Sequence, residues 1–133
     1  MDNCIFCMII EGKIPSRRVY EDENCIAMLD INPATPGHTL ILPKEHHQDL
    51  TEMNEALLGK LMMTARKIGI LQKERLGAIG FNVIQNNGEA AGQTVPHFHI
   101  HVIPRYEGGP MLGGWVPTEP SGDELDEVLA KML

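Results

Sequence analysis

The chain has 133 residues and a net charge of −7, with 43% hydrophobic and 22% charged residues, a composition typical of a globular protein with one domain. The negative charge argues against binding a nucleic-acid polymer, although it allows a small phosphorylated ligand. The apolar runs are too short for a membrane span, and the N-terminus lacks the pattern of a secretory signal. Three cysteines without such a signal favour a reducing cytoplasm as the location.

The first part of the chain predicts one short helix and three strands. Apolar residues within 4–10 suit a short helix that stops at Gly12. Residues 19–20 and 25–29 are expected to form a hairpin around the polar cluster 21–24. Residues 38–43 form a third strand, whose continuous apolar run predicts burial on both faces.

The middle of the chain predicts the only long helix, over residues 51–76. Leu57, Leu61, Ala65 and Ile68 recur at steps of four and three and make one apolar stripe. Thr51 is a suitable N-cap and Gly77 a suitable stop. A fourth strand over 79–85 and a glycine-containing loop over 86–93 follow.

The last part of the chain predicts a fifth strand, an irregular segment and a final helix. Residues 97–103 alternate histidine with bulky apolar residues. Residues 104–120 are rich in glycine and proline, and a capping box at Ser121 opens a short amphipathic helix. The expected fold is therefore α+β: an antiparallel sheet of about five strands with the long helix on one face and short helices at both ends. We expect one domain over 1–133, with a core of 1–105 and a C-terminal tail of 106–133.

Three histidines on one face of a strand are the strongest functional signal. In a strand, residues i, i+2 and i+4 share a face, so His97, His99 and His101 are expected to form a row opposite Phe98 and Ile100. Three such side chains are difficult to satisfy as ordinary core residues. The row is therefore a candidate site, either as three catalytic zinc ligands or as a source of an imidazole nucleophile that attacks phosphorus.

The residues around the row favour the nucleophile. A catalytic zinc needs nearby carboxylates, but the nearest acidic residues, Glu89 and Glu107, lie in expected loops. Gly92-Gln93-Thr94, just before the strand, offers donors suited to phosphate oxygens.

The run from Gly92 to Ile103, with its His-x-His-x-His and two apolar residues, resembles the signature of the histidine-triad family of nucleotide hydrolases and transferases. Asp30-Ile31-Asn32-Pro33 and Pro36-Gly37-His38 resemble the nucleoside-binding strand and turn of that family. The resemblance covers residues from about Cys4 to Arg105 and implies the same fold.

Carried onto this sequence, the resemblance implies that His99 is the nucleophile that attacks the α-phosphorus of a purine nucleotide conjugate. His101 and His38 would then hydrogen-bond the phosphate, and His97 would orient its neighbour through its backbone carbonyl. The other implied nucleotide contacts are Asp30 with the ribose, Ile31 with the base, and Asn86, Gly92, Gln93 and Thr94 with the phosphate or the leaving group. No organic cofactor is expected.

A second site is implied by Cys4 and Cys7. The Cys-x-x-Cys pair needs two more ligands for a closed zinc site. Some members of the family hold a structural zinc with such a pair and two histidines, and the matching residues here are His46 and His97. His47 is an alternative to His46, and two packed thiols without metal are the alternative to zinc.

The C-terminal region departs from the phosphoramidase branch of the family, in which a tryptophan-containing tail ends the chain and reaches the partner subunit. Here Trp115 is followed by another helix, and Pro96-His97 and Ile103-Pro104-Arg105 are closer to the branch that cleaves dinucleoside polyphosphates. The departures leave the histidine step better supported than the leaving group. The resemblance implies the attack of His99 on a nucleoside phosphoramidate or a related conjugate, with a dinucleoside polyphosphate as the alternative. A zinc-dependent hydrolase and a nucleotide-binding adaptor with vestigial activity are the rivals from other classes. A homodimer is expected from the resemblance.

Overall fold

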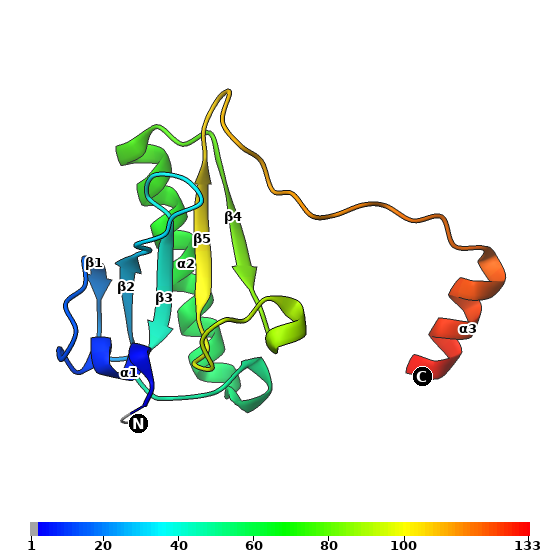
Figure 1. Ribbon diagram of the computed structural model, residues 1–133, viewed down its shortest axis with the longest axis horizontal. Coiled ribbons are helices and arrows are strands. Elements are labelled where there is room, and N and C mark those ends of the chain that lie inside the picture. The colour runs from blue at the N-terminus through cyan, green and yellow to red at the C-terminus, as the bar shows by residue number, and fades with distance from the viewer. Residues whose placement is uncertain (1–2) are drawn as a thin grey trace.

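A five-stranded antiparallel sheet with the strand order β1-β2-β3-β5-β4 forms the body of the molecule in the computed structural model, which describes residues 3–133 (Figure 1). The expected α+β class is confirmed. The strands are β1 (Arg18–Glu21), β2 (Cys25–Leu29), β3 (Thr39–Pro43), β4 (Gly80–Gln85) and β5 (Ile100–Arg105). The helices are α1 (Ile5–Ile10), α2 (Glu55–Leu76) and α3 (Gly122–Met132), with short 3-10 turns at Leu50–Glu52 and Glu89–Ala91.

Side-chain alternation in the strands separates the core into two layers. Ala27 and Ile41 face α2, where they pack with Leu61 and Ile68. Their neighbours Ile26, Met28, Leu40 and Leu42 face the opposite side, where Phe6 and Ile9 of α1 cover them. The strand β3 is buried throughout, as expected from its apolar run.

The long helix α2 begins later than its sequence pattern predicts. Asn54, rather than Thr51, is its N-cap, and the Asn54 side chain accepts a hydrogen bond from the Leu57 amide at 2.8 Å. Thr51 instead lies in the 3-10 turn that Asp49 caps. The helix ends as expected at Gly77, whose φ of 73° is the left-handed conformation that glycine adopts most easily.

The histidine segment is a strand only in its second half. β5 begins at Ile100, so the expected strand start at His97 is wrong. The backbone turns aside at residues 95–97, where the His97 amide donates to the Val95 carbonyl at 2.8 Å, and the Phe98 amide donates to the His47 carbonyl at 2.7 Å. The expected alternation survives, because Phe98, Ile100 and Val102 all pack in the core under α2.

The tail leaves the body after β5 and runs past β4 before it ends in α3 (Figure 1). Every residue of α3 is exposed. Among the described residues, no helix combines the length and apolar character that a bilayer crossing requires.

Candidate functional site

His99 and His101 stand side by side at the centre of the sheet, with ring centroids 5.1 Å apart. The His99 Nδ1–H donates to the His97 carbonyl at 2.7 Å, which orients the ring and leaves Nε2 as its free nitrogen. His99 lines a cavity of about 300 Å³ together with His101. An imidazole held in this tautomer presents a lone pair to whatever occupies the cavity.

A chain of hydrogen bonds also fixes the tautomers of His38 and His101. The Ala34 amide donates to Nδ1 of His38 at 3.0 Å, so the proton of His38 is on Nε2. Nε2 of His38 lies 3.0 Å from Nδ1 of His101 and donates to it. The proton of neutral His101 is therefore on Nε2, so that this ring presents a donor beside the lone pair of His99.

Burial keeps the three rings of this site neutral. Desolvation is the main cause, and the neighbouring His99 and His38 a further one, that together lower the pKa of His101 to about 4, while Asp30 acts against them. Burial also lowers the pKa of His99 and of His38, although the carbonyl of His97 and the carboxylate of Asp30, respectively, act against it. A neutral imidazole is the nucleophilic form at neutral pH.

One end of the cavity is suited to a nucleoside. Asp30 and Ile31 line it, and Ile31 is 82% exposed and free to contact a flat ring. Oδ1 of Asp30 accepts from the Asn32 amide at 2.8 Å, while Oδ2 lies 3.6 Å from Nε2 of His38. The carboxylate thus keeps acceptor capacity for hydroxyl groups.

A glycine-containing loop borders the other side of the histidines. Gly92 (φ +94°), Gln93 and Thr94 line a second cavity of about 550 Å³, and Thr94 lines both cavities. The Gln93 amide holds the loop, because Nε2 donates to the Gln48 and Val95 carbonyls and Oε1 accepts from the Gly88 amide. Asn86 lies beside Gly92, since a Cβ added there would be 3.7 Å from its Nδ2. Of the four loop residues named by the sequence, Thr94 thus lines the cavity of His99, whereas Gly92 and Gln93 line the second cavity and Asn86 lies next to Gly92.

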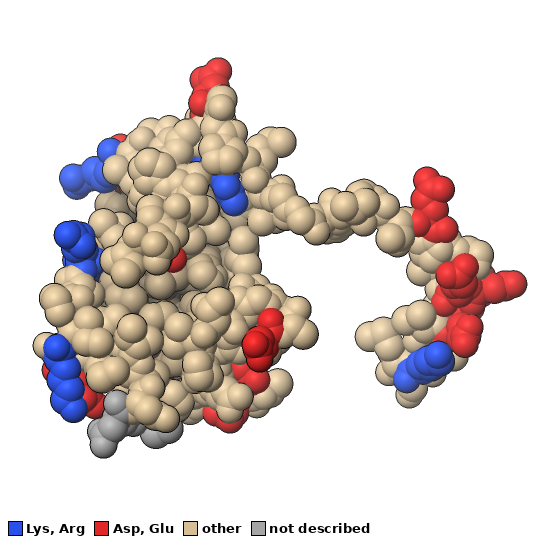
Figure 2. All heavy atoms as spheres, in the orientation of Figure 1, with Lys and Arg blue, Asp and Glu red and all other residues tan. Residues whose placement is uncertain are grey.

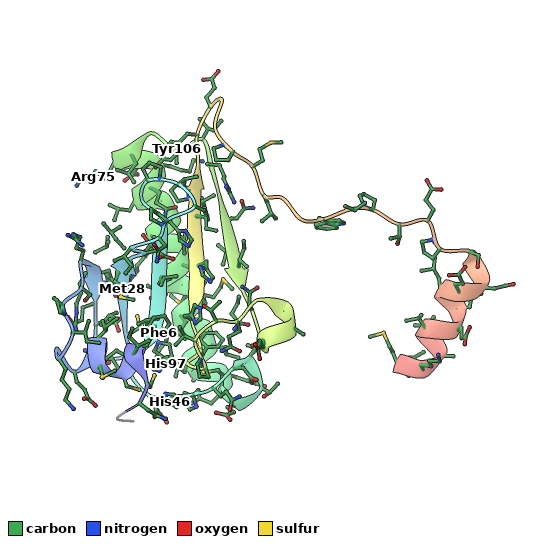
Figure 3. The ribbon with its side chains drawn as sticks, in the orientation of Figure 1. Phe6, Met28, His46, Arg75, His97 and Tyr106 are labelled. Carbon is green, nitrogen blue, oxygen red and sulfur yellow. The ribbon has the colours of Figure 1, made fainter. Side chains whose placement is uncertain are left out.

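A separate cluster joins α1 to the histidine segment. The thiols of Cys4 and Cys7 and the Nδ1 atoms of His46 and His97 all lie within 4.8 Å of one another. Figure 3 shows His97 between Phe6 and His46 at the lower end of the sheet. His47 is not part of this cluster. Burial and the neighbouring Cys4 raise the pKa of Cys7 to about 11, so that without metal this thiol stays protonated.

The donor set of this cluster fits a tetrahedral metal ion. Nε2–H of His97 donates to the Pro43 carbonyl at 2.9 Å, so the lone pair of Nδ1 faces the cluster. Nδ1 of His97 lies 3.5 Å from each sulfur and 3.1 Å from Nδ1 of His46. Zinc–ligand bonds of about 2.0–2.3 Å at tetrahedral angles require ligand separations of roughly 3.3–3.8 Å. The four ligands already stand near these separations.

Several residues around the site carry no sequence signal. Phe6 packs edge-on against His99 with centroids 5.1 Å apart, and the Ala34 amide and the Pro43 carbonyl fix ring tautomers. A sequence pattern predicts only that an apolar aromatic residue in a short helix packs in the core, and it does not indicate which backbone groups bond to a histidine ring. Only the fold brings them to the histidines.

The comparison with protein families agrees with this geometry. A family model described as the HIT domain matches residues 11–108. The chain belongs to the histidine-triad family. Members of this family are nucleotide hydrolases and transferases, and this is the general class to which the chain belongs.

Two histidine-triad relatives differ in how much is known of them. An uncharacterized HIT-like protein of Methanocaldococcus jannaschii is 45% identical over 130 residues, which is 97% of this chain and 98% of the relative. A protein of Arabidopsis thaliana named adenylylsulfatase is 41% identical over 106 residues, which is 80% of this chain and 54% of that protein.

Solved structures of histidine-triad relatives share the whole architecture. A crystal structure from Streptococcus mutans superposes with a TM-score of 0.92 at 41% identity, covering 99% of this chain and 84% of that one. A histidine-triad protein from Mycobacterium smegmatis, described as zinc-bound, has a TM-score of 0.81 at 41% identity and covers 98% of this chain and 96% of its own.

Proposed function

We propose that this protein cleaves purine nucleotide conjugates at the α-phosphorus through a nucleotidyl intermediate on His99, with nucleoside phosphoramidates as the preferred substrates. The observation that carries the proposal is the hydrogen bond from Nδ1–H of His99 to the His97 carbonyl, which leaves the Nε2 lone pair of a buried neutral ring in the cavity. In the first step Nε2 forms a bond to phosphorus, and the bond from phosphorus to the amine breaks as the amine takes a proton from solvent and leaves. In the second step water attacks phosphorus and gives a proton to solvent, while the bond from Nε2 to phosphorus breaks, which releases the monophosphate and restores neutral His99.

The neighbouring side chains have complementary roles in this proposal. Nε2–H of His101 donates to a phosphate oxygen, where negative charge grows in the transition state, and His38 holds that ring in place. Asp30 accepts from the ribose hydroxyls and Ile31 contacts the base. The loop containing Asn86, Gly92, Gln93 and Thr94 binds the phosphate or the leaving group, for which the larger cavity of about 550 Å³ gives room.

The candidate substrates, phosphoramidates, adenylyl sulfate and dinucleoside polyphosphates, differ in their leaving group. The Arabidopsis relative is named an adenylylsulfatase, and adenylyl sulfate is also an adenosine nucleotide conjugate that carries its leaving group on the α-phosphate. A panel of adenosine phosphoramidate, adenylyl sulfate and a dinucleoside polyphosphate, compared by kcat/KM, ranks the three. The proposal expects the phosphoramidate to rank first, and a preference for the dinucleoside polyphosphate would overturn that choice while leaving the chemistry of His99 in place.

Mass spectrometry of enzyme quenched in alkaline denaturant tests the intermediate, because the phosphorus–nitrogen bond of a nucleotidyl-histidine is hydrolysed in acid. Single turnovers with each substrate should add one nucleoside monophosphate to the peptide containing His99, and His99→Asn should show no adduct and no turnover. Absence of the adduct in wild-type protein that still turns over, together with loss of turnover on chelation, would support a zinc-dependent hydrolase instead.

We also propose that Cys4, Cys7, His46 and His97 hold a structural zinc. When bound, the metal would crosslink α1 to the segment that orients His99, and the residues lie at suitable separations for it. Cys4, Cys7 and Cys25 are free thiols, which agrees with the reducing cytoplasm that we propose as the location. Elemental analysis of protein purified without added metal should give about one zinc per chain, and a value well below this would contradict the proposal.

A homodimer completes the proposed assembly. β4 is an edge strand whose outer side is not paired in the sheet, and beside it α2 exposes Met62 and Met63 at 55% and 54%. These side chains form a largely apolar patch with Gly59, Phe81 and Val83, which Arg66 also borders. An open strand edge next to such a patch is a natural place for a second copy of the chain.

A further inference from the structure

The loop of residues 30–38 joins β2 to β3 and carries two groups that the proposed chemistry uses. Asp30 lines the nucleoside end of the histidine cavity, and the Ala34 amide donates to Nδ1 of His38 at 3.0 Å. The Asp30 amide donates to the His38 carbonyl at 2.9 Å and so closes the base of the loop. In Figure 2 the face that carries the histidines is hollowed beside this loop. These contacts close the 30–38 loop but do not attach it to the rest of the sheet.

The sheet opens beside this loop. The pairing of β3 with β5 begins at Thr39 and Val102, but β5 runs on past this point, so its carbonyl groups there need other donors. Gln72 of α2 donates from Nε2 to the Val102 carbonyl at 3.0 Å. The Thr35 hydroxyl donates to the Pro104 carbonyl at 2.6 Å. Side chains thus replace strand pairing at this end of the sheet.

Thr35 attaches the middle of the 30–38 loop to β5. It is only 4% exposed, and the Pro104 side chain beside it is fully buried. Its carbonyl also accepts from the His38 amide at 3.1 Å. Because Thr35 follows Ala34 directly in the chain, its hydroxyl bond sets the place of the Ala34 amide relative to the strand that carries His101.

Two further side chains hold the next two carbonyl groups of the loop. The Tyr106 hydroxyl donates to the Pro36 carbonyl, and Figure 3 shows Tyr106 at the upper end of β5. Nε2 of Gln72 donates to the Gly37 carbonyl at 3.1 Å. A Cβ added at Gly37 would clash with Leu76, so the loop also passes close to α2. Each of residues 35–37 is therefore attached to β5, to α2 or to the segment after β5.

Gln72 makes its two bonds at a cost to stability. It is 2% exposed, and its Oε1 is buried without a hydrogen-bond partner among the described residues. A buried acceptor of this kind destabilises the folded chain, and such exceptions are expected where function sets the side chain. Gln72 does not line the histidine cavity, and the 30–38 loop is its connection to the residues that do.

We propose that Thr35 is a positioning residue of the histidine site, because its hydroxyl bond to β5 keeps the Ala34 amide on Nδ1 of His38. The amide in turn keeps the proton of His38 on Nε2, from which it donates to Nδ1 of His101. The bonds to the carbonyl groups of residues 36 and 37 support the same loop. The inference rests on the proposed function and extends it to residues outside the cavity.

Loss of the hydroxyl bond would change the group that faces the phosphate. Without the Ala34 amide in place, neutral His38 can carry its proton on Nδ1, and its Nε2 becomes an acceptor toward His101. His101 must then carry its own proton on Nδ1 to keep the bond between the rings. Its Nε2 would present a lone pair instead of an N–H group to the phosphate oxygen, which disfavours the growing negative charge of the transition state.

Imidazole ¹⁵N NMR of the ligand-free protein at neutral pH tests the positioning role without any need for activity. In the wild type, Nε2 of His38 and of His101 should be protonated and Nδ1 of each should not. Thr35→Val removes the hydroxyl from a side chain of similar shape, and a second tautomer of His101 should be populated to at least about 10%. Thr35→Ser keeps a hydroxyl and should give the wild-type pattern.

Thr64→Val is the matched control for the loss of a buried hydroxyl. Thr64 is 3% exposed, and its hydroxyl donates to the Lys60 carbonyl of the same helix at 3.1 Å. This variant should leave the tautomers of both rings unchanged. Tyr106→Phe, at a half-buried position, removes the bond to the Pro36 carbonyl and should shift the tautomers in the same direction as Thr35→Val, so it gives the same comparison if Thr35→Val does not fold.

Steady-state kinetics with adenosine phosphoramidate gives a second measurement. Thr35→Val should lower kcat at least about fivefold, because the ring beside the reacting phosphorus is no longer held in one form, and Thr35→Ser should stay within about twofold of the wild type. KM should change less than kcat, because the bond from the Asp30 amide to the His38 carbonyl remains. Equal changes of kcat and KM would indicate general damage to the loop and contradict the role.

Unchanged tautomers in both Thr35→Val and Tyr106→Phe would overturn the proposal, and so would equal shifts in Thr35→Val and Thr64→Val. The adduct on His99 separates this failure from failure of the proposed function. A wild-type protein that forms the adduct, with tautomers that do not respond to Thr35→Val, contradicts only the positioning role. A wild-type protein that forms no adduct contradicts the proposed function, and with it the catalytic purpose of the Thr35 bond.

Discussion

At the residue scale, the chemistry of the site depends on which nitrogen of each ring carries a proton. His38 receives a hydrogen bond from the Ala34 amide and donates one to His101, at 3.0 Å each. A backbone amide cannot change its direction of donation, so it sets the tautomers of both rings. His38 therefore acts through His101 rather than on the substrate in this arrangement.

Substitution of His38 should distinguish a positioning role, in which it acts through His101, from direct contact with the substrate. His38→Ala removes the donor to Nδ1 of His101, and we expect kcat to fall by about 10–100-fold with a smaller change in KM. His38→Gln can supply an amide N–H to His101 and should recover most of the lost kcat. Steady-state kinetics with adenosine phosphoramidate measures both variants, and equal loss in Ala and Gln would contradict the positioning role.

The buried His101 should also make the fold sensitive to acid. Its pKa is about 4 in the folded protein, below the ordinary value of 6.5, because burial disfavours the charged ring. Between pH 6.5 and pH 4 the unfolded chain binds a proton that the folded chain does not. The free energy of unfolding therefore falls as the pH falls through this window, by about 1–2 kcal/mol from this group after solvent screening, and the loss is absent above pH 6.5.

Denaturant unfolding at several pH values checks the contribution of His101. His101→Asn has no titrating ring, so its stability should decline less steeply than that of the wild type between pH 6.5 and pH 4. Parallel pH profiles of the two proteins would show that other groups cause the acid sensitivity.

At the element scale, the proposed metal is expected to strengthen the attachment of the short helix α1 to the sheet. Its six residues are too few to be stable alone, and it packs through Phe6, Cys7 and Ile9. Cys7→Ser should reduce zinc to well below one per chain and lower the Tm by roughly 5–10 °C, because metal binding contributes to folding.

Cys25→Ala is the matched control for the loss of a buried thiol. Cys25 lies in β2, in the core under α2 and away from the proposed zinc ligands. This variant should keep its zinc and should lose stability on addition of a chelator, whereas Cys7→Ser should not respond to the chelator. A similar chelator response in both proteins would contradict a structural role for the metal.

The contact between α2 and β4 depends on a glycine. A Cβ added at Gly69 would lie 2.3 Å from the Phe81 ring, while one added at Gly59 of the same helix would meet nothing within 4 Å. Alanine favours a helix by up to about 1 kcal/mol over glycine, so Gly59→Ala should stabilise the protein. Gly69→Ala should instead destabilise it by about 1–2 kcal/mol, because Phe81 must move. Chemical denaturation of both variants gives the comparison, and a stabilised Gly69→Ala would contradict close packing there.

Periodic patterns in the sequence predicted the elements of this fold well, whereas local hydrogen bonds decided their ends. The stripe of Leu57, Leu61, Ala65 and Ile68 predicted α2 and its buried face. The start of α2 could not be predicted, because Thr51 and Asn54 are both good caps. Thr51 is taken up by the 3-10 turn at Leu50–Glu52, and this leaves Asn54 as the cap.

The same limit explains the histidine segment. Alternation predicted which face each residue of 98–102 occupies, but His97 turns its ring toward Cys4, Cys7 and His46, and these lie far away in the sequence. The late start of β5, after residues 97–99, therefore depends on tertiary contacts. The roles of the Ala34 amide and the Pro43 carbonyl depend on such contacts as well. The resemblance to the histidine-triad family supplied the residue roles that the pattern alone left open.

At the scale of the whole molecule, one exposed apolar patch lies on elements that do not line the histidine cavity. This patch lies on α2 and β4, at one edge of the sheet, and consists of Gly59, Met62, Met63, Phe81 and Val83. α1 covers the opposite face of the sheet from α2. A partner at β4 would extend the antiparallel sheet from five strands to ten and leave the cavity beside His99 open to substrate. Dimerisation and catalysis are thus expected to be separable by mutation.

Met63→Lys tests this separation. Met63 is 54% exposed, so a lysine there should leave the fold of one chain intact but place a charge in the proposed interface, and we expect dimer affinity to fall at least tenfold, or about 1.4 kcal/mol. Leu50→Lys makes the same kind of change at a 43% exposed position outside the patch and should leave the dimer unchanged. Analytical ultracentrifugation over a range of concentrations measures both variants. Unchanged association of Met63→Lys would exclude this patch as the interface, whereas a monomeric variant that retains single-turnover attack by His99 would show that each chain contains a complete site.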